Sequence, residues 1–209
     1  MVDSRVPSFL EENRLRRRGY KLIAGVDEVG RGALAGPVMA AAVILPPKIK
    51  TPWAEKVRDS KFLSPEQRES LYGPICEASV AFGVGSVDSW TISSIGIARA
   101  TQIAMSQAVS QLSPLAEALL IDYFEIPDVR LPQKGVVDGD TLCFSIACAS
   151  IVAKVTRDRL MAGFDSSYPG YLFSRHKGYG TAEHLEFLRR LGPCPIHRRN
   201  FQPVIDADS

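Results

Sequence analysis

The pattern of apolar residues predicts five strands along the chain. Residues 38–45 are continuously apolar, as in a strand buried on both faces, and residues 21–26 lead to them through a glycine-rich turn. Residues 80–87 alternate loosely between apolar and polar positions, which favours a third strand. Short apolar runs predict two more strands, over residues 118–122 and 135–137.

Between these strands, apolar residues recur at helical spacing. The clearest start signal is Ser64 followed by Pro65, because serine caps a helix and proline is tolerated at the first helical position. We predict helices over residues 64–78, 95–112, 141–164 and 182–191. Strands separated by helices predict an α/β fold, with a central mixed sheet flanked by helices and a short helical C-terminal part.

Composition is that of an ordinary globular domain. The chain has 209 residues, of which 45% are hydrophobic and 23% charged. We expect one domain over residues 1–209, with its core at about residues 20–204, a basic N-terminal segment over 1–19 and a tail over 205–209. The net charge of +2 is too small to indicate nucleic acid by itself. A basic cluster near the C-terminal end is compatible with a solvated face or a phosphate-facing one, and comprises Arg175, Lys177, Arg189, Arg190, Arg198 and Arg199.

Cysteines and histidines do not predict a zinc site. The four cysteines form no Cys-x-x-Cys pair, and His176, His184 and His197 are too scattered along the chain for a zinc triad. The first twenty residues carry charges throughout, unlike a signal peptide, and the apolar run 33–47 is interrupted by glycine and proline. We expect a cytoplasmic monomer that does not associate with a membrane.

The most informative segment is residues 25–32, Gly-Val-Asp-Glu-Val-Gly-Arg-Gly. Asp27 and Glu28 stand where a predicted strand ends, and carboxylate oxygens bind hard divalent cations. Glycines let a ligand approach the main-chain N–H groups closely, and arginine suits phosphate. The segment predicts a metal site facing a phosphate-bearing substrate, although Gly-Arg-Gly alone is also compatible with a plain turn.

Further acids follow the same pattern elsewhere in the chain. Asp122 ends an apolar run, as Asp27 does. Asp140 precedes a predicted helix and is either a further ligand or the helix N-cap, and nearby Asp138 leaves that choice open. Asp158 lies in a segment with the charge pattern of an exposed helix face. Four acids from separate elements suggest two divalent ions, Mg²⁺ or Mn²⁺, that promote phosphoryl transfer.

Several motifs, taken in order, resemble those of bacterial ribonuclease HII, a family of type 2 ribonucleases H. The resemblance opens with residues 26–38 and covers about residues 20–204. Its other motifs are Asp59-Ser60-Lys61, Leu120-Ile121-Asp122, Gly139-Asp140, residues 146–159, residues 176–181 and residues 197–201. It implies a ribonuclease H-like fold, cleavage of RNA in RNA–DNA hybrids, and incision 5′ of single ribonucleotides in duplex DNA.

The resemblance also implies roles for individual residues. The implied catalytic and metal-binding acids are Asp27, Glu28, Asp122 and Asp140. Contacts to the ribose 2′-hydroxyl, the group that distinguishes RNA from DNA, are implied for the backbone of Gly30, Arg31 and Gly32 and for the side chain of Tyr179. Phosphate contacts are expected for the lysines that lie within its motifs, Lys61 and Lys177.

The chain departs from the family pattern in places. Tyr123 stands where the family commonly has glycine, and it either alters the local backbone or adds a stacking surface near the cleft. The chain ends soon after Val204, which predicts weaker binding of long hybrids than in relatives with a longer helical C-terminus.

Two other functions fit parts of the sequence. A related metal nuclease, such as a junction resolvase, would share the acids but not need the ribose contacts. A silent nucleic-acid-binding module is disfavoured by the intact set of acids, because bare carboxylates repel phosphate.

Overall fold

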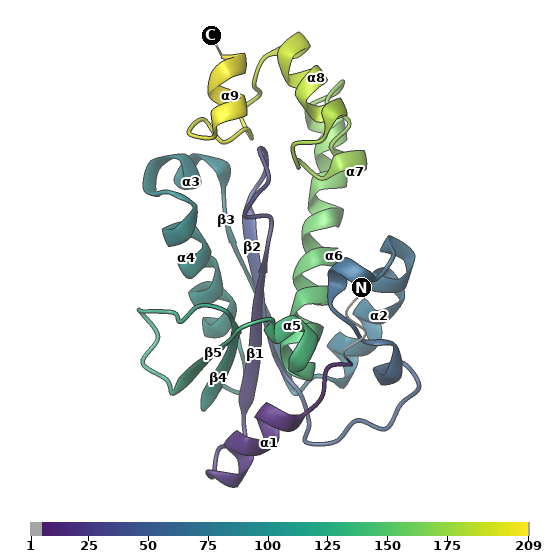
Figure 1. Ribbon diagram of the computed structural model, residues 1–209, viewed down its shortest axis with the longest axis vertical. Helices are drawn as coiled ribbons and strands as arrows, with labels where there is room; N and C mark the ends of the chain where they lie inside the picture. Colours follow the sequence, from purple (N-terminus) through teal and green to yellow (C-terminus); the bar gives the residue numbers. More distant parts are fainter. Residues whose placement is uncertain (1–5, 209) are drawn as a thin grey trace.

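A five-stranded mixed sheet forms the centre of the computed structural model (Figure 1), which describes residues 6–208. Residues 1–5 of the expected N-terminal segment and Ser209 of the expected tail lie outside the described residues. The strands are β1 (Ile23–Val29), β2 (Val38–Ile44), β3 (Ala81–Val87), β4 (Ala118–Asp122) and β5 (Gln133–Val136). Their order is β3-β2-β1-β4-β5; β1–β2 and β2–β3 are antiparallel, whereas β1–β4 and β4–β5 are parallel. The predicted mixed α/β sheet is confirmed.

Helices cover both faces of this sheet and both of its ends. They are α1 (Leu10–Arg17), α2 (Pro65–Ala78), α3 (Ser89–Ile95), α4 (Ile97–Ser110), α5 (Gly139–Leu142), α6 (Phe144–Ser167), α7 (Phe173–His176), α8 (Ala182–Leu191) and α9 (Gln202–Ala207). Two 3₁₀ helices, η1 (Ala54–Lys56) and η2 (Ser60–Phe62), precede α2. Figure 1 shows α7, α8 and α9 gathered at one end of the molecule and α1 at the other. Within residues 6–208, none of the helices combines the length and hydrophobicity needed to cross a bilayer.

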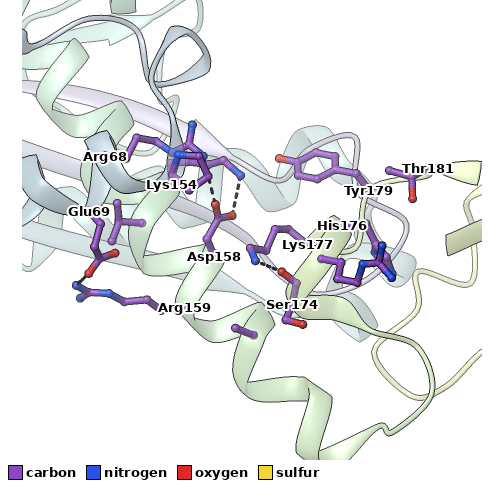
Figure 2. Close-up of a pocket in the computed structure, with 14 residues that line it drawn as sticks. Arg68, Glu69, Lys154, Asp158, Arg159, Ser174, His176, Lys177, Tyr179 and Thr181 are labelled. Carbon is purple, nitrogen blue, oxygen red and sulfur yellow. Dashed lines mark hydrogen bonds and ion pairs between the residues drawn. The ribbon is translucent and has the colours of Figure 1, made fainter. Parts of the chain in front are cut away.

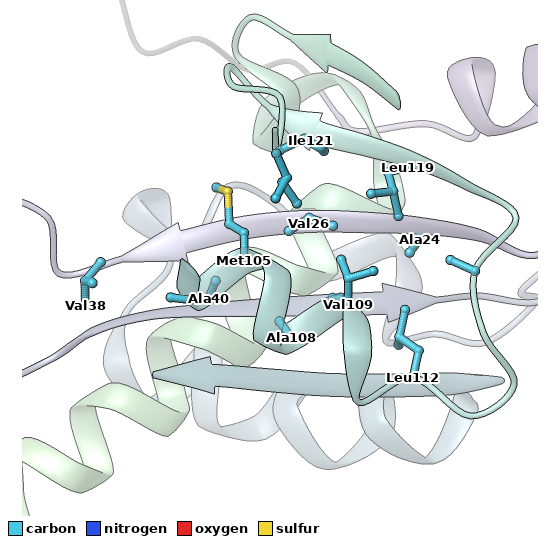
Figure 3. Close-up of a cluster of buried hydrophobic side chains, with 14 of the residues drawn as sticks. Ala24, Val26, Val38, Ala40, Met105, Ala108, Val109, Leu112, Leu119 and Ile121 are labelled. Atoms are coloured by element: carbon cyan, nitrogen blue, oxygen red, sulfur yellow. The ribbon is translucent and has the colours of Figure 1, made fainter. Parts of the chain in front are cut away.

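The core lies on the two faces of the sheet. On one face, Met105 and Ala108 of α4 pack in a cluster with Val26, Ala40 and Ile121 of the strands (Figure 3). On the other face, α6 and α2 enclose a second cluster of buried residues. Burying apolar area stabilises the fold by roughly 25 cal/mol per Å², so these two faces anchor every strand that reaches the site.

Close packing of α6 on β1 depends on a glycine. A Cβ atom at Gly25 would lie 2.2 Å from the carbonyl carbon of Ser145 at the start of α6. Only glycine permits that approach, which brings the next turns of α6 against the end of β1. The acids of the predicted site therefore lie at a tightly packed junction of strand and helix.

One predicted helix is divided in two, and another starts later than expected. The helix expected over 141–164 breaks at Cys143, whose backbone is extended (φ −105°, ψ 124°), because the N-terminal segment crosses there. Ser8 forms a parallel bridge with Cys143. The N–H of Ser8 donates to the carbonyl of Leu142 at 3.0 Å, and the N–H of Phe144 donates to the carbonyl of Ser8 at 3.1 Å. The helix expected over 95–112 corresponds to α4, and Gly96, with φ 81°, separates it from α3, a further helix that was not predicted.

Candidate active site

The register of two parallel strands places two acids side by side. Val26 on β1 pairs with Ile121 on β4. Continuing that register by one residue sets Asp27 beside Asp122, on strands that lie roughly 4.8 Å apart. Asp27 is buried, and its Oδ1 accepts the backbone N–H of Glu28 at 2.7 Å. The two strand ends predicted to carry carboxylates therefore meet at one point under α6.

Asp140 joins this pair from the first turn of α5. The N-cap position of that helix belongs to Asp138, so Asp140 is free for another role. The backbone N–H of Gly139 donates to Oδ1 of Asp122 at 2.8 Å, and Nζ of Lys61 donates to Oδ2 of Asp140 at 3.0 Å. Burial alone lowers the pKa of Lys61, but the hydrogen bond and charge of Asp140 raise it overall. Lys61 is thus a fixed cation beside the acids.

Glu28 follows Asp27 and faces a different set of neighbours. Its Oε1 lies 3.3 Å from Nη1 of Arg31, whose guanidinium is 4.5 Å from the centre of the Phe124 ring. The other oxygen, Oε2, is buried and has no hydrogen-bond partner among residues 6–208. A buried carboxylate oxygen without a partner is costly, so this atom lacks a donor or a cation.

Crowding of negative charge shifts the acids away from their ordinary behaviour. Burial raises the pKa of Asp27 well above its usual range, and the charges of Glu28 and Asp122 raise it further. Burial also raises the pKa of Glu28 against the opposing effect of Arg31. The pKa of Asp122 is raised by burial and by the charge of Asp140. Without a cation, these carboxylates repel one another.

The donor set fits a hard divalent cation. All of the candidate ligands are carboxylate oxygens, which suit Mg²⁺ and Mn²⁺. Within the described part of the chain, no three His, Cys, Asp or Glu side chains already converge as a closed ligand set. The acids are therefore neighbours rather than a preformed cage, and a cation between them would relieve their repulsion and give Oε2 of Glu28 a partner.

A cavity of about 190 Å³ lies among these groups. Predicted site residues that line it are Asp27, Glu28, Gly30, Arg31, Lys61, Asp122 and Tyr179. Asp140 adjoins it through Lys61, and Gly32 lies exposed in the loop that contains Gly30. Lys177 does not line this cavity. The structure thus brings most of the predicted residues to one place.

A buried arginine fixes the glycine-rich loop from the C-terminal end of the chain. Arg198 is 0% exposed and donates to the carbonyls of Gly30 (2.6 Å), Arg31 (2.8 Å) and Gly36 (3.1 Å). A phosphate-facing role for Arg198, which the basic cluster had left open, is therefore wrong. Its guanidinium donates inward because three carbonyls of one loop converge on it.

A second buried arginine, Arg157 of α6, joins that loop to the segment that carries Tyr179. It is 0% exposed and donates to the carbonyls of Pro37 (2.9 Å), Ala35 (3.0 Å) and Lys177 (2.9 Å). A Cβ atom at Gly30 would lie 2.3 Å from its Nε. Gly30 is therefore required by packing against Arg157 as well as by its positive φ of 85°.

Tyr179 is held beside the glycine-rich loop by backbone pairing. It forms an antiparallel bridge with Ala33, and its ring centre lies 5.3 Å from the guanidinium carbon of Arg157. Lys177, two residues earlier, turns its ammonium back to the carbonyl of Ser174. Tyr179 therefore faces the cavity of the acids, while Lys177 faces a neighbouring groove.

Figure 2 shows that groove, of about 660 Å³, with Tyr179 and Lys154 among its lining residues. Both residues also line the acid cavity, so the groove continues from it. Nζ of Lys154 lies 5.5 Å from the Tyr179 ring centre and 2.7 Å from Oδ1 of Asp158. Arg68 of α2 lies 3.9 Å from the other oxygen of Asp158. Asp158 is therefore a partly buried link between α2 and α6, and the prediction of an exposed face for it is wrong.

The three histidines, far apart in sequence, meet in space. The rings of His176 and His184 stack with centres 4.2 Å apart, and Nε2 of His184 lies 3.1 Å from Nε2 of His197. The N–H of Cys194 donates to Nδ1 of His197, and Nδ1 of His184 lies 2.9 Å from the carbonyl of Tyr179. These partners suit neutral rings, with His197 donating to His184 and His184 to Tyr179. Histidines that lie far apart along the chain therefore form one cluster, and the cluster supports the Tyr179 segment.

Comparison with known proteins identifies the family. The family model described as Ribonuclease HII matches residues 24–204. A Ribonuclease HII of Dehalococcoides mccartyi is 60% identical over 198 residues, which cover 95% of this chain and 93% of that protein. The chain belongs to the ribonuclease HII family. A Ribonuclease HII of Caldicellulosiruptor saccharolyticus is 50% identical over 192 residues, 92% of each chain. Membership makes the chain a ribonuclease H, a phosphodiester hydrolase.

Solved structures share the ribonuclease HII fold at low identity. The ribonuclease H2 of Pyrococcus horikoshii OT3 superimposes with a TM-score of 0.70 at 23% identity, covering 89% of this chain and 96% of that one. Bst-RNase HIII in complex with Mn²⁺ gives a TM-score of 0.73 at 21% identity, covering 96% and 72%. The predicted ribonuclease H-like fold is confirmed.

Sequence reasoning missed the residues that position this site. Arg157 and Arg198 belong to motifs of the ribonuclease HII family, but nothing in their immediate sequence indicates burial. Phe124 and Ser150 were also missed, since each contacts a site residue from a distant element.

Proposed function

We propose that this chain cleaves the RNA strand of RNA–DNA hybrids and incises duplex DNA on the 5′ side of single ribonucleotides. Family membership supports cleavage of a phosphodiester bond. The finer substrate choice is supported by one observation: a buried cluster of mutually repelling acids shares a cavity with Tyr179 and the glycine-rich loop. The site can thus combine a cation with a contact to the ribose.

The acids have the chemistry of metal ligands. We propose that Asp27, Glu28, Asp122 and Asp140 hold two divalent cations, Mg²⁺ or Mn²⁺. When bound, such cations activate water and stabilise a departing oxygen. Lys61 keeps Asp140 in place by its 3.0 Å hydrogen bond and is available to a phosphate oxygen.

Recognition of the ribose falls to the loop clamped by Arg157 and Arg198. We propose that main-chain groups of residues 30–32 and the hydroxyl of Tyr179 contact the 2′-hydroxyl. Gly32 has open space around it, since an added Cβ would meet no atom within 4 Å, so a sugar can approach the backbone there. Lys177, in the adjoining groove, is proposed to contact the phosphate backbone further along the duplex.

The proposed reaction is hydrolysis. A water attacks the phosphorus on the 5′ side of the ribonucleotide, and the 3′-oxygen of the preceding nucleotide departs. The products carry a 3′-hydroxyl and a 5′-phosphate. Gly30 and Tyr179 orient the ribose, and the acids position the groups that act on the phosphate.

Three duplexes test this function, each assayed with Mg²⁺, Mn²⁺ and EDTA. One contains a single ribonucleotide, one is an RNA–DNA hybrid and one is all DNA. We expect cleavage of the first two with either cation, none in EDTA, and none of all-DNA. Equal cleavage of the all-DNA duplex would instead favour a resolvase-like nuclease, and binding indifferent to EDTA without cleavage would favour a silent module.

We propose further that residues 1–209 form a single domain with its core at about 20–204 and act as a cytoplasmic monomer. Packing at both ends supports the single domain: Leu15 of α1 clusters with Leu120 of β4, and Val204 of α9 with Leu34. Sedimentation velocity at micromolar concentration measures the oligomeric state.

A further inference from the structure

Tyr123 combines an unfavourable backbone with an exposed ring, directly after Asp122. Its φ is 64°, in the left-handed region that disfavours large residues, and the residue is 64% exposed. Hydrogen bonds hold the backbone in place: the N–H of Tyr123 donates to Val136 at 3.0 Å, and that of Phe124 to Asp122 at 2.8 Å. The backbone of Tyr123 is therefore fixed in the position that directly follows Asp122.

The ring belongs to an aromatic pair that is joined to the acid cavity through Arg31, which lines that cavity. Tyr123 packs edge-on against Phe124, with ring centres 4.9 Å apart and planes at 75°. Phe124 in turn lies under the guanidinium of Arg31, which is paired with Glu28. We call Tyr123 and Phe124 the aromatic shelf. Arg31 links this shelf to the wall of the cavity.

Folding does not account for the ring of Tyr123. Most of its surface stays in water, so burial contributes little. Glycine or asparagine would accept the same backbone with less strain. Strain kept beside an active site, without a compensating burial, points to a contact made only when a ligand is present.

We propose that the aromatic shelf packs against a sugar of the nucleic acid duplex, as a substrate contact additional to Tyr179. The inference rests on the proposed function, since it requires a duplex in the acid cavity. An aromatic face suits this place because it packs on the apolar face of a sugar without adding charge, and every nucleotide of a duplex carries a sugar. The contact is independent of sequence and strengthens binding rather than the chemical step.

Two substitutions at one position test the proposal. Tyr123→Asn removes the ring and tolerates the left-handed backbone, whereas Tyr123→Phe keeps the ring. Trp90→Asn is the matched control, because Trp90 is 78% exposed on α3 and does not line the acid cavity. For each variant, kcat and KM are measured on a duplex with a single ribonucleotide, and the melting temperature is measured without substrate.

We expect Tyr123→Asn to raise KM about tenfold with kcat within about twofold of wild type, and to melt no lower than wild type. Tyr123→Phe and Trp90→Asn should keep the wild-type KM. An unchanged KM in Tyr123→Asn overturns the proposal. If the melting temperature of that variant is also lowered, the ring has a structural role. If the wild-type protein leaves this duplex uncut while cutting all-DNA, the proposed function fails instead.

Discussion

At the scale of single residues, the site is defined by charges that the fold holds together at a cost. Asp27 is buried beside Glu28 and Asp122, and burial with their charges raises its pKa. A protein that gained only stability from these positions would not keep three acids there. Their repulsion is what a divalent cation would relieve, so the metal-free protein should be less stable than the metal-loaded one.

Replacing the central acid separates stability from activity. Asp27→Asn removes a buried charge, so we expect the metal-free melting temperature to rise, by about 2–4 °C for each kcal/mol of repulsion relieved. Cleavage of a single-ribonucleotide duplex should fall by at least about a hundredfold, since a ligand is lost. Calorimetric melting and initial rates measure the two effects. Near-wild-type cleavage at saturating Mg²⁺ contradicts the assignment.

Tyr179 should matter most where one ribose must be found among deoxyriboses. We expect Tyr179→Ala to lower incision at a single embedded ribonucleotide by about tenfold or more, because a hydrogen bond and a ring contact are lost together. Tyr179→Phe retains the ring and should show a smaller loss. Incision rates of both variants on the single-ribonucleotide duplex are compared with the wild-type rate. Unchanged incision by Tyr179→Ala would mean that the residue is merely structural.

At the scale of elements, the site depends on connections between distant segments. The sequence predicted the strands because their apolar runs are long and bounded by turns, and Ser64 and Pro65 marked the start of α2. It could not predict the break at Cys143, because that break is caused by the crossing of Ser8, 135 residues away in the chain. It also could not show that Arg198 is buried, since burial follows from tertiary packing.

Arg198 shapes the glycine-rich loop by donating to three of its carbonyls. Arg198→Lys keeps the charge but loses the planar fork, so we expect a loss of about 1–3 kcal/mol and weaker cleavage of single-ribonucleotide duplexes. Arg199→Lys is the matched control, since Arg199 is exposed and pairs with Asp208. Denaturant unfolding and cleavage rates are measured for both variants. Equal stability and equal rates in Arg198→Lys and Arg199→Lys would show that Arg198 does not position the loop.

At the scale of the whole molecule, the C-terminal end depends on a histidine cluster that must stay neutral. Burial and the neighbouring histidines lower the pKa of His184 and of His197 to about 4 each. The unfolded value is about 6.5, so protonation favours the unfolded state. The neutral histidines therefore contribute their full stabilisation of the folded state above pH 6.5, and this contribution is lost as the pH falls from 6.5 through about 4.

This predicts a specific pH dependence. Wild-type protein should lose stability between pH 6.5 and 4, whereas His197→Gln, less stable at pH 7.5, should lose less over the same range. The repelling acids act in the opposite direction, so the difference between variants isolates the histidine contribution. Urea melts at several pH values provide the measurement. If wild type and His197→Gln lose the same stability between pH 6.5 and 4, the histidines do not control the pH dependence.

The central claim is that separate strand ends supply acids that share a divalent cation. Calorimetric titration of Mn²⁺ into wild type, Asp27→Asn and Asp122→Asn measures this without any substrate. We predict saturable binding to wild type that weakens at least tenfold in both variants. Equal Mn²⁺ affinity in all three proteins would contradict it.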